Sequence, residues 1–236
     1  MTYWLKWLHR WTSLIILLQV LIWLITGLYF AIVGHTEIAA HQHYSDTAKT
    51  SQEGLPFLAV GDADISSIYA RYSGVTSLQV RQVQQRLQYV VTHDKGQTFL
   101  DAKSGEIWQT GAALAGQLAM ASYTGPGSIE TITHITNSDE LADWQPQQQG
   151  GYRVTINDDL NTRIYVDAAS ATVIDHRNDP WVIADWAFKL HFMDYSGGRD
   201  FNNLLIRAAG LITLWLALSG LILLIRNIKR GDLKLR

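Results

Sequence analysis

Two long apolar runs lie near the two ends of this chain, and a polar region with short alternating segments separates them. The first run covers residues 12–33 and contains no charge, and the second covers residues 204–225 and contains only Arg207. As helices the runs would each extend about 33 Å, enough to cross the hydrocarbon core of a bilayer, which is roughly 30 Å thick. Each run therefore predicts a transmembrane helix.

A secretory signal peptide is the alternative interpretation of the first run. The apolar part of such a peptide is typically about 7–15 residues long and ends at a small-x-small cleavage site. This run is longer and ends in Tyr29-Phe30-Ala31-Ile32-Val33, which is a poor cleavage sequence. We therefore favour an uncleaved membrane anchor.

Basic and aromatic residues at the ends of the runs predict their orientation. Lys6 and Arg10 precede the first run, and a basic tail follows the second: Arg226, Lys229, Arg230, Lys234 and Arg236. Because basic flanks stay in the cytoplasm, we expect both termini there and the central region outside. Tryptophans before both runs suit the headgroup layer: Trp4, Trp7, Trp11, Trp181 and Trp186. The basic tail is interpreted as a solvated anchor, so no nucleic-acid partner is predicted.

The central region contains the same kind of unit twice. Each copy begins with a short helical pattern and continues into three short runs with the alternation of antiparallel strands. The helical patterns lie near residues 63–72 and 112–123, the first set of strands near 75–83, 87–92 and 97–100, and the second near 129–135, 151–156 and 162–166. Both copies end in Asp-Ala-x-Ser, at Asp101 and at Asp167. The pattern predicts an α+β domain of two helix-plus-three-strand repeats.

Composition removes several classes of function. The chain of 236 residues has no cysteine, which excludes disulfides, iron–sulfur clusters, thiolate zinc sites and covalent c-type haem. No G-x-G-x-x-G follows a predicted strand, and neither G-x-S-x-G nor H-E-x-x-H occurs. The sequence therefore predicts no catalytic residue of its own, and any electrons that pass through the chain would come from another protein.

Short motifs around the apolar runs resemble those of a known family. Leu8-His9-Arg10-Trp11 opens the first run, Thr26-Gly27-Leu28 and Ser219-Gly220-Leu221 lie inside the runs, and Leu190-His191-Phe192-Met193-Asp194-Tyr195 precedes the second. Together with the two closing Asp-Ala-x-Ser turns, they resemble the bacterial PepSY-associated transmembrane family over nearly the whole chain. One departure is Ala171, where the turn normally carries glycine, so a backbone with positive φ would be mildly strained there.

The resemblance implies a membrane α+β fold in the bacterial inner membrane, in which two transmembrane helices flank an extracytoplasmic domain of two PepSY-like repeats. The expected segments are a cytoplasmic N-terminus (1–11), transmembrane helix (12–33), linker (34–56), first repeat (57–110), second repeat (111–178), interfacial segment (179–203), second transmembrane helix (204–225) and cytoplasmic tail (226–236).

The resemblance also implies two alternative functions. Larger relatives bind b-type haem through membrane histidines and reduce ferric siderophores or similar acceptors outside the membrane. This chain would then be a haem-binding subunit that passes electrons outward, with a flavin-containing reductase as a candidate donor. Two spans cannot enclose a haem, so a homodimer or a larger membrane complex is expected. The alternative is a non-enzymatic anchored module that binds or regulates a periplasmic protease or an assembly partner.

His9, His191 and His35 are the candidate haem ligands, because neutral imidazole suits iron and charge is costly in a membrane. Along a helix His9 and His35 would be about 39 Å apart, so His9 needs a partner from a second copy or another subunit. His191 is predicted to lie in an aromatic stretch on the outer membrane surface, where it could share an iron with His35. The alternative is that His9 and His191 are ordinary interfacial residues.

The remaining histidines give weaker predictions. His41 and His43 are a poor metal pair, because no third ligand of fixed geometry accompanies them, and no metal site is predicted. His93, His134 and His176 are expected to be solvated in loops or at strand ends.

Overall fold

The computed structural model describes residues 2–45, 62–136, 150–195 and 200–231. The chain divides into two compact units, each described here by itself. The helical unit comprises Met1–His35 and Val182–Arg236, and the sheet domain comprises Thr36–Trp181.

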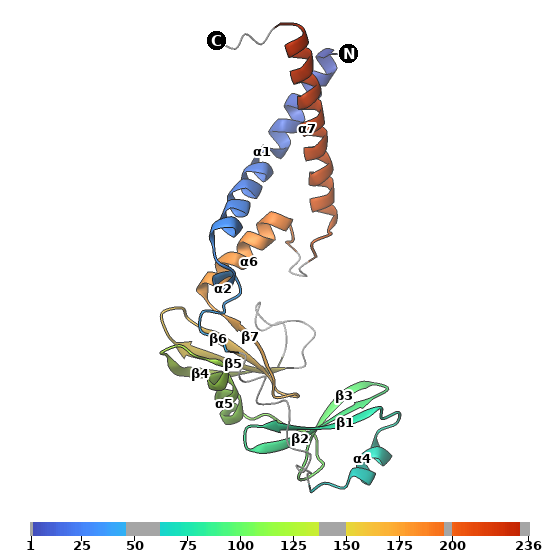
Figure 1. Ribbon diagram of the computed structural model, residues 1–236, viewed down its shortest axis with the longest axis vertical. Helices are drawn as coiled ribbons and strands as arrows, with labels where there is room; N and C mark the ends of the chain where they lie inside the picture. The colour runs from blue at the N-terminus through green and yellow to red at the C-terminus, as the bar shows by residue number, and fades with distance from the viewer. Residues whose placement is uncertain (1, 46–61, 137–149, 196–199, 232–236) are drawn as a thin grey trace. The chain divides into compact units, whose positions relative to one another are not determined.

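The helical unit is built from two long helices and one shorter one. They are α1 (Thr2–Ile32), α6 (Asp179–Phe192) and α7 (Leu204–Lys229), and the short α2 (His35–Ile38) begins at the end of the unit. Helices α1 and α7 lie side by side (Figure 1). Their candidate spans are Tyr3–Ile32 and Leu204–Lys229, and only 11% of the most apolar window of each is buried. Such exposed apolar helices are unlike the core helices of a soluble protein and support the prediction of two transmembrane helices.

Helix α1 begins well before the apolar run that predicted it. The tryptophans and His9 that precede residue 12 are part of the same helix. Trp4 and Trp7, and then Trp7 and Trp11, follow one another along one side, with ring centroids 5.8 and 6.4 Å apart. At the start of α7, the side chain of Asn203 accepts a hydrogen bond from the backbone N–H of Ile206 at 3.0 Å and caps the helix.

The first repeat of the sheet domain is a helix packed on a three-stranded antiparallel sheet. Its elements are α4 (Ile65–Arg71), β1 (Ser77–Val83), β2 (Arg86–His93) and β3 (Gly96–Asp101), in the sheet order β1-β2-β3. Alternate residues of β2 point into a small core, and its members are Ile68, Tyr89, Val91, Leu100 and Ala102. The four consecutive residues Gln88 to Val91 are all buried, so the centre of β2 is covered on both faces.

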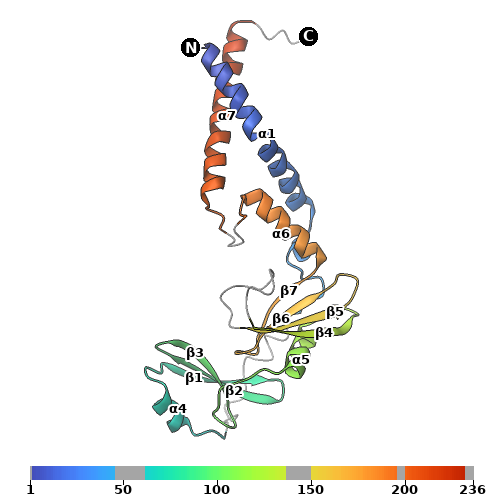
Figure 2. The ribbon, with the colours of Figure 1, turned by 180° about the vertical axis from the view of Figure 1, so that it is seen from behind.

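The second repeat has the same order of elements but a larger sheet. Its elements are α5 (Ala112–Ser122), β4 (Ser128–Ile135), β5 (Gly151–Asn157), β6 (Arg163–Asp167) and β7 (Val173–Arg177), in the sheet order β4-β5-β6-β7. Figure 2 shows α5 beside this sheet. The sequence predicted three strands here, and the fourth, β7, was missed. It forms because the chain turns back after Asp167 and pairs Asp175 and His176 with Tyr165 and Ile164 of β6.

The two closing turns adopt the same local structure. In the first turn the side chain of Asp101 accepts hydrogen bonds from two backbone N–H groups that follow it, and in the second the side chain of Asp167 accepts one from the backbone N–H of Ser170. Gly105 has φ 72° and Ala171 has φ 57° at the equivalent position. The predicted departure at Ala171 is therefore confirmed, and an alanine occupies a left-handed conformation that glycine adopts more easily.

The two repeats share a core within the sheet domain. Val83 and Trp108 of the first repeat join the hydrophobic cluster beneath α5, whose remaining buried members are Ala115, Leu118, Ala119, Tyr123, Val154, Ile156, Ile164, Val166 and Ala171. The guanidinium of Arg81 also donates a hydrogen bond to the backbone carbonyl of Ser170 in the second closing turn. The duplicated units therefore form one folded domain.

Candidate functional site

His191 lies against α1 in a cluster that we define as His191, Thr26 and Gly27. Its Nδ1 is 2.7 Å from Oγ1 of Thr26. A Cβ atom built on Gly27 would lie 3.9 Å from Cε1 of His191, so the imidazole rests on the helix backbone beside the glycine. The ring of Phe30 meets the imidazole edge-on at 5.8 Å between centroids. The imidazole is half-buried in this arrangement.

Polar side chains of α1 hold the end of α6 in place. The indole N–H of Trp23 donates to the backbone carbonyl of His191 at 2.6 Å, and the amide of Gln19 donates to that of Leu190 at 3.2 Å. Carbonyls in the last turn of a helix have no partner within the helix, so these bonds satisfy them. The rings of Phe30 and Phe188 add a contact at 4.5 Å.

These contacts bear on the expected position of His191. The sequence predicted that its helix lies on the membrane surface. The last turn of α6 contacts Gln19 and Trp23, which belong to the apolar run of residues 12–33. Hydrogen-bond donors of this kind allow helix carbonyls to lie in an apolar layer. The position of this helix at the membrane surface stays a prediction.

His9 forms a second cluster of the same design, which we define as His9, Ser219 and Gly220. Here α1 supplies the imidazole and α7 supplies the hydroxyl and the glycine. Nδ1 of His9 is 2.7 Å from Oγ of Ser219, and a Cβ atom built on Gly220 would lie 3.3 Å from Cε1 of His9. Ser219 is fully buried and the imidazole is half-buried. Each cluster thus combines an imidazole with a hydroxyl-glycine pair on a neighbouring helix.

The sequence motifs identified the histidines of these clusters but not the hydroxyls that bind them. The signal was present in the triplets Thr26-Gly27-Leu28 and Ser219-Gly220-Leu221, which share the order hydroxyl, glycine, leucine. The hydroxyls of these triplets were not predicted as partners of the imidazoles.

The two clusters lie at different levels of the helix pair. His9 and Gly27 are both on α1 and are 18 positions apart, which corresponds to about 27 Å along the helix axis. Two imidazole nitrogens that bind one metal ion lie within a few ångströms of each other, so His9 and His191 of one chain cannot share an iron. Each cluster supplies one imidazole.

The second nitrogen of each imidazole is open. Within the described ranges, Nε2 of His9 and Nε2 of His191 make no hydrogen bond. Unprotonated imidazole nitrogen is a common ligand of haem iron. No group of three or more His, Asp or Glu side chains that could hold a metal ion is found among the described residues. Each cluster therefore offers one imidazole nitrogen that could bind a metal ion.

His35 follows Thr26 and Gly27, the two α1 residues of the His191 cluster, along the chain. It begins α2, and its side chain is exposed. It follows Gly27 by eight positions, or about 12 Å if the helix continued at its regular rise. The α1 residues that contact the His191 imidazole include Thr26, Gly27 and Phe30.

His176 in the sheet domain is buried, which corrects the expectation that it is solvated. Its exposed fraction is 2%, and its Nε2 is 2.8 Å from Oγ of Ser122, which is also buried. The cause is strand β7, whose register places His176 beside Ile164 on the side that packs on α5. Burial, together with a smaller contribution from the nearby charge of His41, lowers the pKa of His176 to about 4.

The other histidines of the sheet domain make contacts typical of packing. His134 is exposed as predicted, whereas His93 is half-buried and 2.9 Å from Oγ1 of Thr98. His41 stacks on Tyr44 with 4.7 Å between centroids, and His43 meets Tyr123 edge-on at 5.6 Å.

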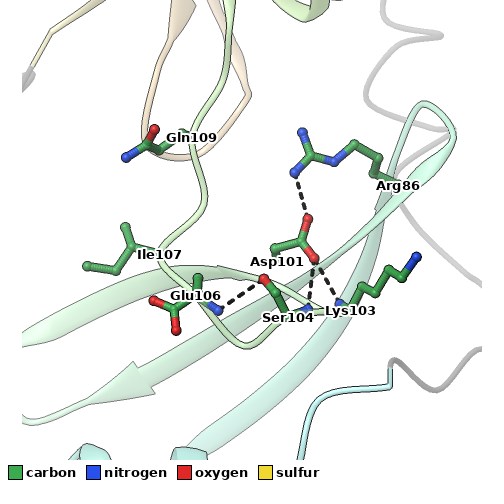
Figure 3. A pocket seen from close by; sticks show the side chains of 7 residues that line it. All are labelled: Arg86, Asp101, Lys103, Ser104, Glu106, Ile107 and Gln109. Carbon is green, nitrogen blue, oxygen red and sulfur yellow. Dashed lines mark hydrogen bonds and ion pairs between the residues drawn. The ribbon is translucent and has the colours of Figure 1, made fainter.

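An open depression lies beside the first closing turn (Figure 3). It is lined by Arg86, Asp101, Lys103, Ser104, Glu106, Ile107 and Gln109. Two of its charged groups bond to one another: Arg86 pairs with Asp101 at 2.6 Å, and the guanidinium lies over the ring of Trp108 at 4.2 Å. Partial burial raises the pKa of the Asp101 carboxyl, but hydrogen bonds from Arg86, Lys103 and Ser104 outweigh it, and the net pKa is lowered. These contacts stabilise the turn itself.

Comparison with known proteins gives one match. A family model described as the PepSY-associated TM region matches residues 6–236, a range that contains both imidazole clusters. No curated protein and no solved structure matches the chain significantly.

Proposed function

Because this chain belongs to the PepSY-associated transmembrane family, we propose that it is a haem-binding membrane subunit that carries electrons from one face of the bilayer to the other. One observation carries the proposal. Two half-buried imidazoles lie at two levels of a pair of apolar helices, and each is bound through Nδ1 and open at Nε2. Interfacial histidines that bind no ligand would not require the same hydroxyl and glycine partners at both levels.

The residues present fit a b-type haem. When bound, the haem iron supplies reversible one-electron chemistry. His9 and His191 would each supply a nitrogen ligand at one level. Gly27 and Gly220 let each imidazole lie close to the neighbouring helix. His35, exposed at the start of α2, is the alternative ligand at the level of His191.

A second copy of the chain would complete both sites. In a dimer with a twofold axis parallel to the helices, equivalent residues face one another, so the two His9 side chains would meet at one level and the two His191 side chains at the other. The largely exposed apolar surfaces of α1 and α7 are available for such packing and for lipid. This arrangement gives two haems per dimer, or one haem per chain.

The basic flanks give the proposed direction of transfer. Lys6 and Arg10 of α1 and Arg226 and Lys229 of α7 lie near the same end of the helix pair as His9. The positive-inside rule places that end in the cytoplasm of a bacterial inner membrane. Electrons from another protein would enter near His9 and leave near His191 toward an outer acceptor, with ferric iron or a ferric siderophore as the proposed class.

The test is the visible spectrum and the haem content of the full chain, purified in mild detergent from haem-replete cells. We expect a b-type α band after reduction with dithionite and about one haem per chain. His9→Ala and His191→Ala should each remove about half of the haem, because each removes one of two sites. His134→Ala is the matched control, since that side chain is exposed, and it should change neither quantity.

Three other results discriminate between the alternatives. Loss of haem in His35→Ala with full retention in His191→Ala would move the ligand from His191 to His35. Full retention in both His9→Ala and His191→Ala would contradict the proposal. A colourless wild-type protein would favour a binding or regulatory module, which is the alternative supported by the size of the sheet domain, Thr36–Trp181.

A further inference from the structure

We infer that Thr26 and Ser219 are positioning residues that fix the tautomer of the two imidazoles. Each hydroxyl accepts a hydrogen bond from Nδ1–H, which leaves Nε2 unprotonated. The use of this arrangement for a metal rests on the proposed function. The tautomer itself does not, so the two can be tested separately.

The Thr26 hydroxyl has a single proton to donate. Oγ1 of Thr26 is 2.7 Å from the backbone carbonyl of Ile22, one turn earlier in α1. A carbonyl oxygen only accepts hydrogen bonds, so this contact uses the hydroxyl proton. The same oxygen is 2.7 Å from Nδ1 of His191 and has only lone pairs left for it. Nδ1 must therefore carry the proton of that bond.

The Ser219 hydroxyl repeats the same distribution of protons. Its Oγ donates to the backbone carbonyl of Leu216 at 3.1 Å and is 2.7 Å from Nδ1 of His9. A neutral imidazole, the form that suits an apolar span, has one N–H group. With that proton on Nδ1, Nε2 of His9 keeps its lone pair, as does Nε2 of His191.

The arrangement occurs twice on different pairs of helices. In one case α6 brings the imidazole to α1, and in the other α1 brings it to α7. In both cases the residue after the hydroxyl is a glycine, and the imidazole Cε1 lies beside it. The hydrogen bond and the glycine contact therefore come from the same helix, and together they position the ring against it. A hydroxyl that satisfied only its own helix would not require the glycine.

Thr213 supplies an internal reference for a hydroxyl without an imidazole. Its Oγ1 donates to the backbone carbonyl of Ala209 at 2.8 Å, in the same apolar helix as Ser219. The back-bond to the preceding turn is therefore the ordinary state of a hydroxyl in these helices. What distinguishes Thr26 and Ser219 is the imidazole that uses the remaining lone pair.

The hydrogen bond has a consequence for a metal on Nε2. A hydrogen bond from Nδ1–H to an oxygen makes the imidazole a stronger donor and favours the oxidised metal ion. Removal of the acceptor should weaken metal binding at that level by about tenfold or more and raise the reduction potential of the iron there. The effect is expected at one level only for each substitution.

The first experiment measures the tautomers without any haem. The full chain with 15N-labelled histidine is prepared from haem-deficient cells in lipid vesicles, and nitrogen NMR distinguishes protonated from unprotonated ring nitrogens. The signals are assigned by their loss in His9→Asn and His191→Asn. We expect Nδ1–H and bare Nε2 at both residues. Thr26→Val should give a mixture of tautomers at His191 only, and Ser219→Ala at His9 only.

The second experiment uses the haem-loaded protein. Thr26→Val should lower haem retention and raise the midpoint potential of one haem, and Thr26→Ser should restore both, because it returns the hydroxyl. Thr213→Val should change neither quantity, and circular dichroism checks that each variant is folded. A Thr26→Val protein with unaltered tautomer and potential would overturn the inference. The expected tautomers in a chain that never binds haem would support the inference and refute the proposed function.

Discussion

Imidazole–hydroxyl pairs occur in both units of this protein, and they differ in which nitrogen remains open. In the helical unit, Thr26 and Ser219 bind Nδ1 of His191 and His9, and each Nε2 is open. In the sheet domain, Ser122 binds Nε2 of His176. Within the described part of the chain, Nδ1 of His176 is buried and has no hydrogen-bond partner.

The difference shows that a hydroxyl beside an imidazole is not enough to make a site. The hydroxyl of Ser122 donates to the carbonyl of Ala119 at 2.8 Å, so the bond to His176 again uses an imidazole N–H. The remaining lone pair of His176 then lies inside a packed core, where no ligand reaches it. The environment of the second nitrogen decides the role, and it favours binding in the helical unit and packing in the sheet domain.

The largest expected effect in this comparison is acid sensitivity of the sheet domain. Burial lowers the pKa of His176 from its ordinary value of 6.5 to about 4. On acidification the unfolded chain takes up this proton near pH 6.5 and the folded chain only near pH 4. The free energy of unfolding is therefore unaffected by this group above pH 6.5 and falls between pH 6.5 and 4, by up to about 3 kcal/mol. Urea unfolding followed by tryptophan fluorescence at pH 7.5, 6, 5 and 4.5 measures it.

Two substitutions assign this acid sensitivity to one imidazole. His176→Gln removes the titrating group and should flatten the pH dependence, although the domain becomes less stable at pH 7.5. His134→Gln removes an exposed imidazole and should leave the pH dependence of the wild type intact. An equally steep loss of stability in His176→Gln would show that other groups cause it.

The next effect concerns how closely each imidazole of the helical unit lies to its glycine. Gly220→Ala adds a Cβ at 3.3 Å from His9, which forces the ring to move, whereas Gly27→Ala adds one at 3.9 Å from His191, an ordinary contact. Crowding costs roughly 1–3 kcal/mol, and alanine in place of helical glycine returns about 1 kcal/mol. Gly220→Ala should therefore lower the thermal midpoint in detergent, and Gly27→Ala should leave it unchanged or raise it.

Gly210→Ala is the control for these two substitutions, because a Cβ at that position meets nothing within 4 Å. It should raise the thermal midpoint through helix propensity alone. Equal shifts in Gly220→Ala and Gly210→Ala would show that His9 does not rest on Gly220 as described.

The fold was largely predictable because its two kinds of unit have different periodicities. Two uninterrupted apolar runs specify the long helices, and period-two alternation specifies most strands. Strand β7 was missed because both copies were predicted to end at their closing turns. After the first turn the chain forms only an isolated bridge, between Leu100 and Ile107. After the second turn it continues as a strand paired with β6.

The candidate site was predictable only in part. Motifs selected His9 and His191, but their hydroxyl partners are 210 and 165 positions away along the chain. Which residues meet across two apolar helices depends on the rotation and the register of the helices. Hydropathy determines neither when the helices are apolar on nearly every side.

The smallest expected effect uses the duplicated turn as its own control. Gly105 and Ala171 share a left-handed backbone conformation, with φ 72° and 57°. Gly105→Ala places a Cβ 3.4 Å from the Cβ of Ala63, so space is available and the cost is the backbone strain of about 1 kcal/mol. Urea unfolding of the full chain in detergent should show this loss.

Ala171→Gly should not give the opposite result. It relieves a similar strain, but it removes a fully buried methyl group from the shared core and gives the unfolded chain more freedom. Those two losses amount to about 0.8 and 0.4–1 kcal/mol, so the net change should lie near zero or be slightly destabilising. A gain of 1 kcal/mol would mean that the methyl group of Ala171 contributes nothing to the core. In that case the second turn would carry its alanine at a net loss, and the shared core would not explain why the two repeats differ there.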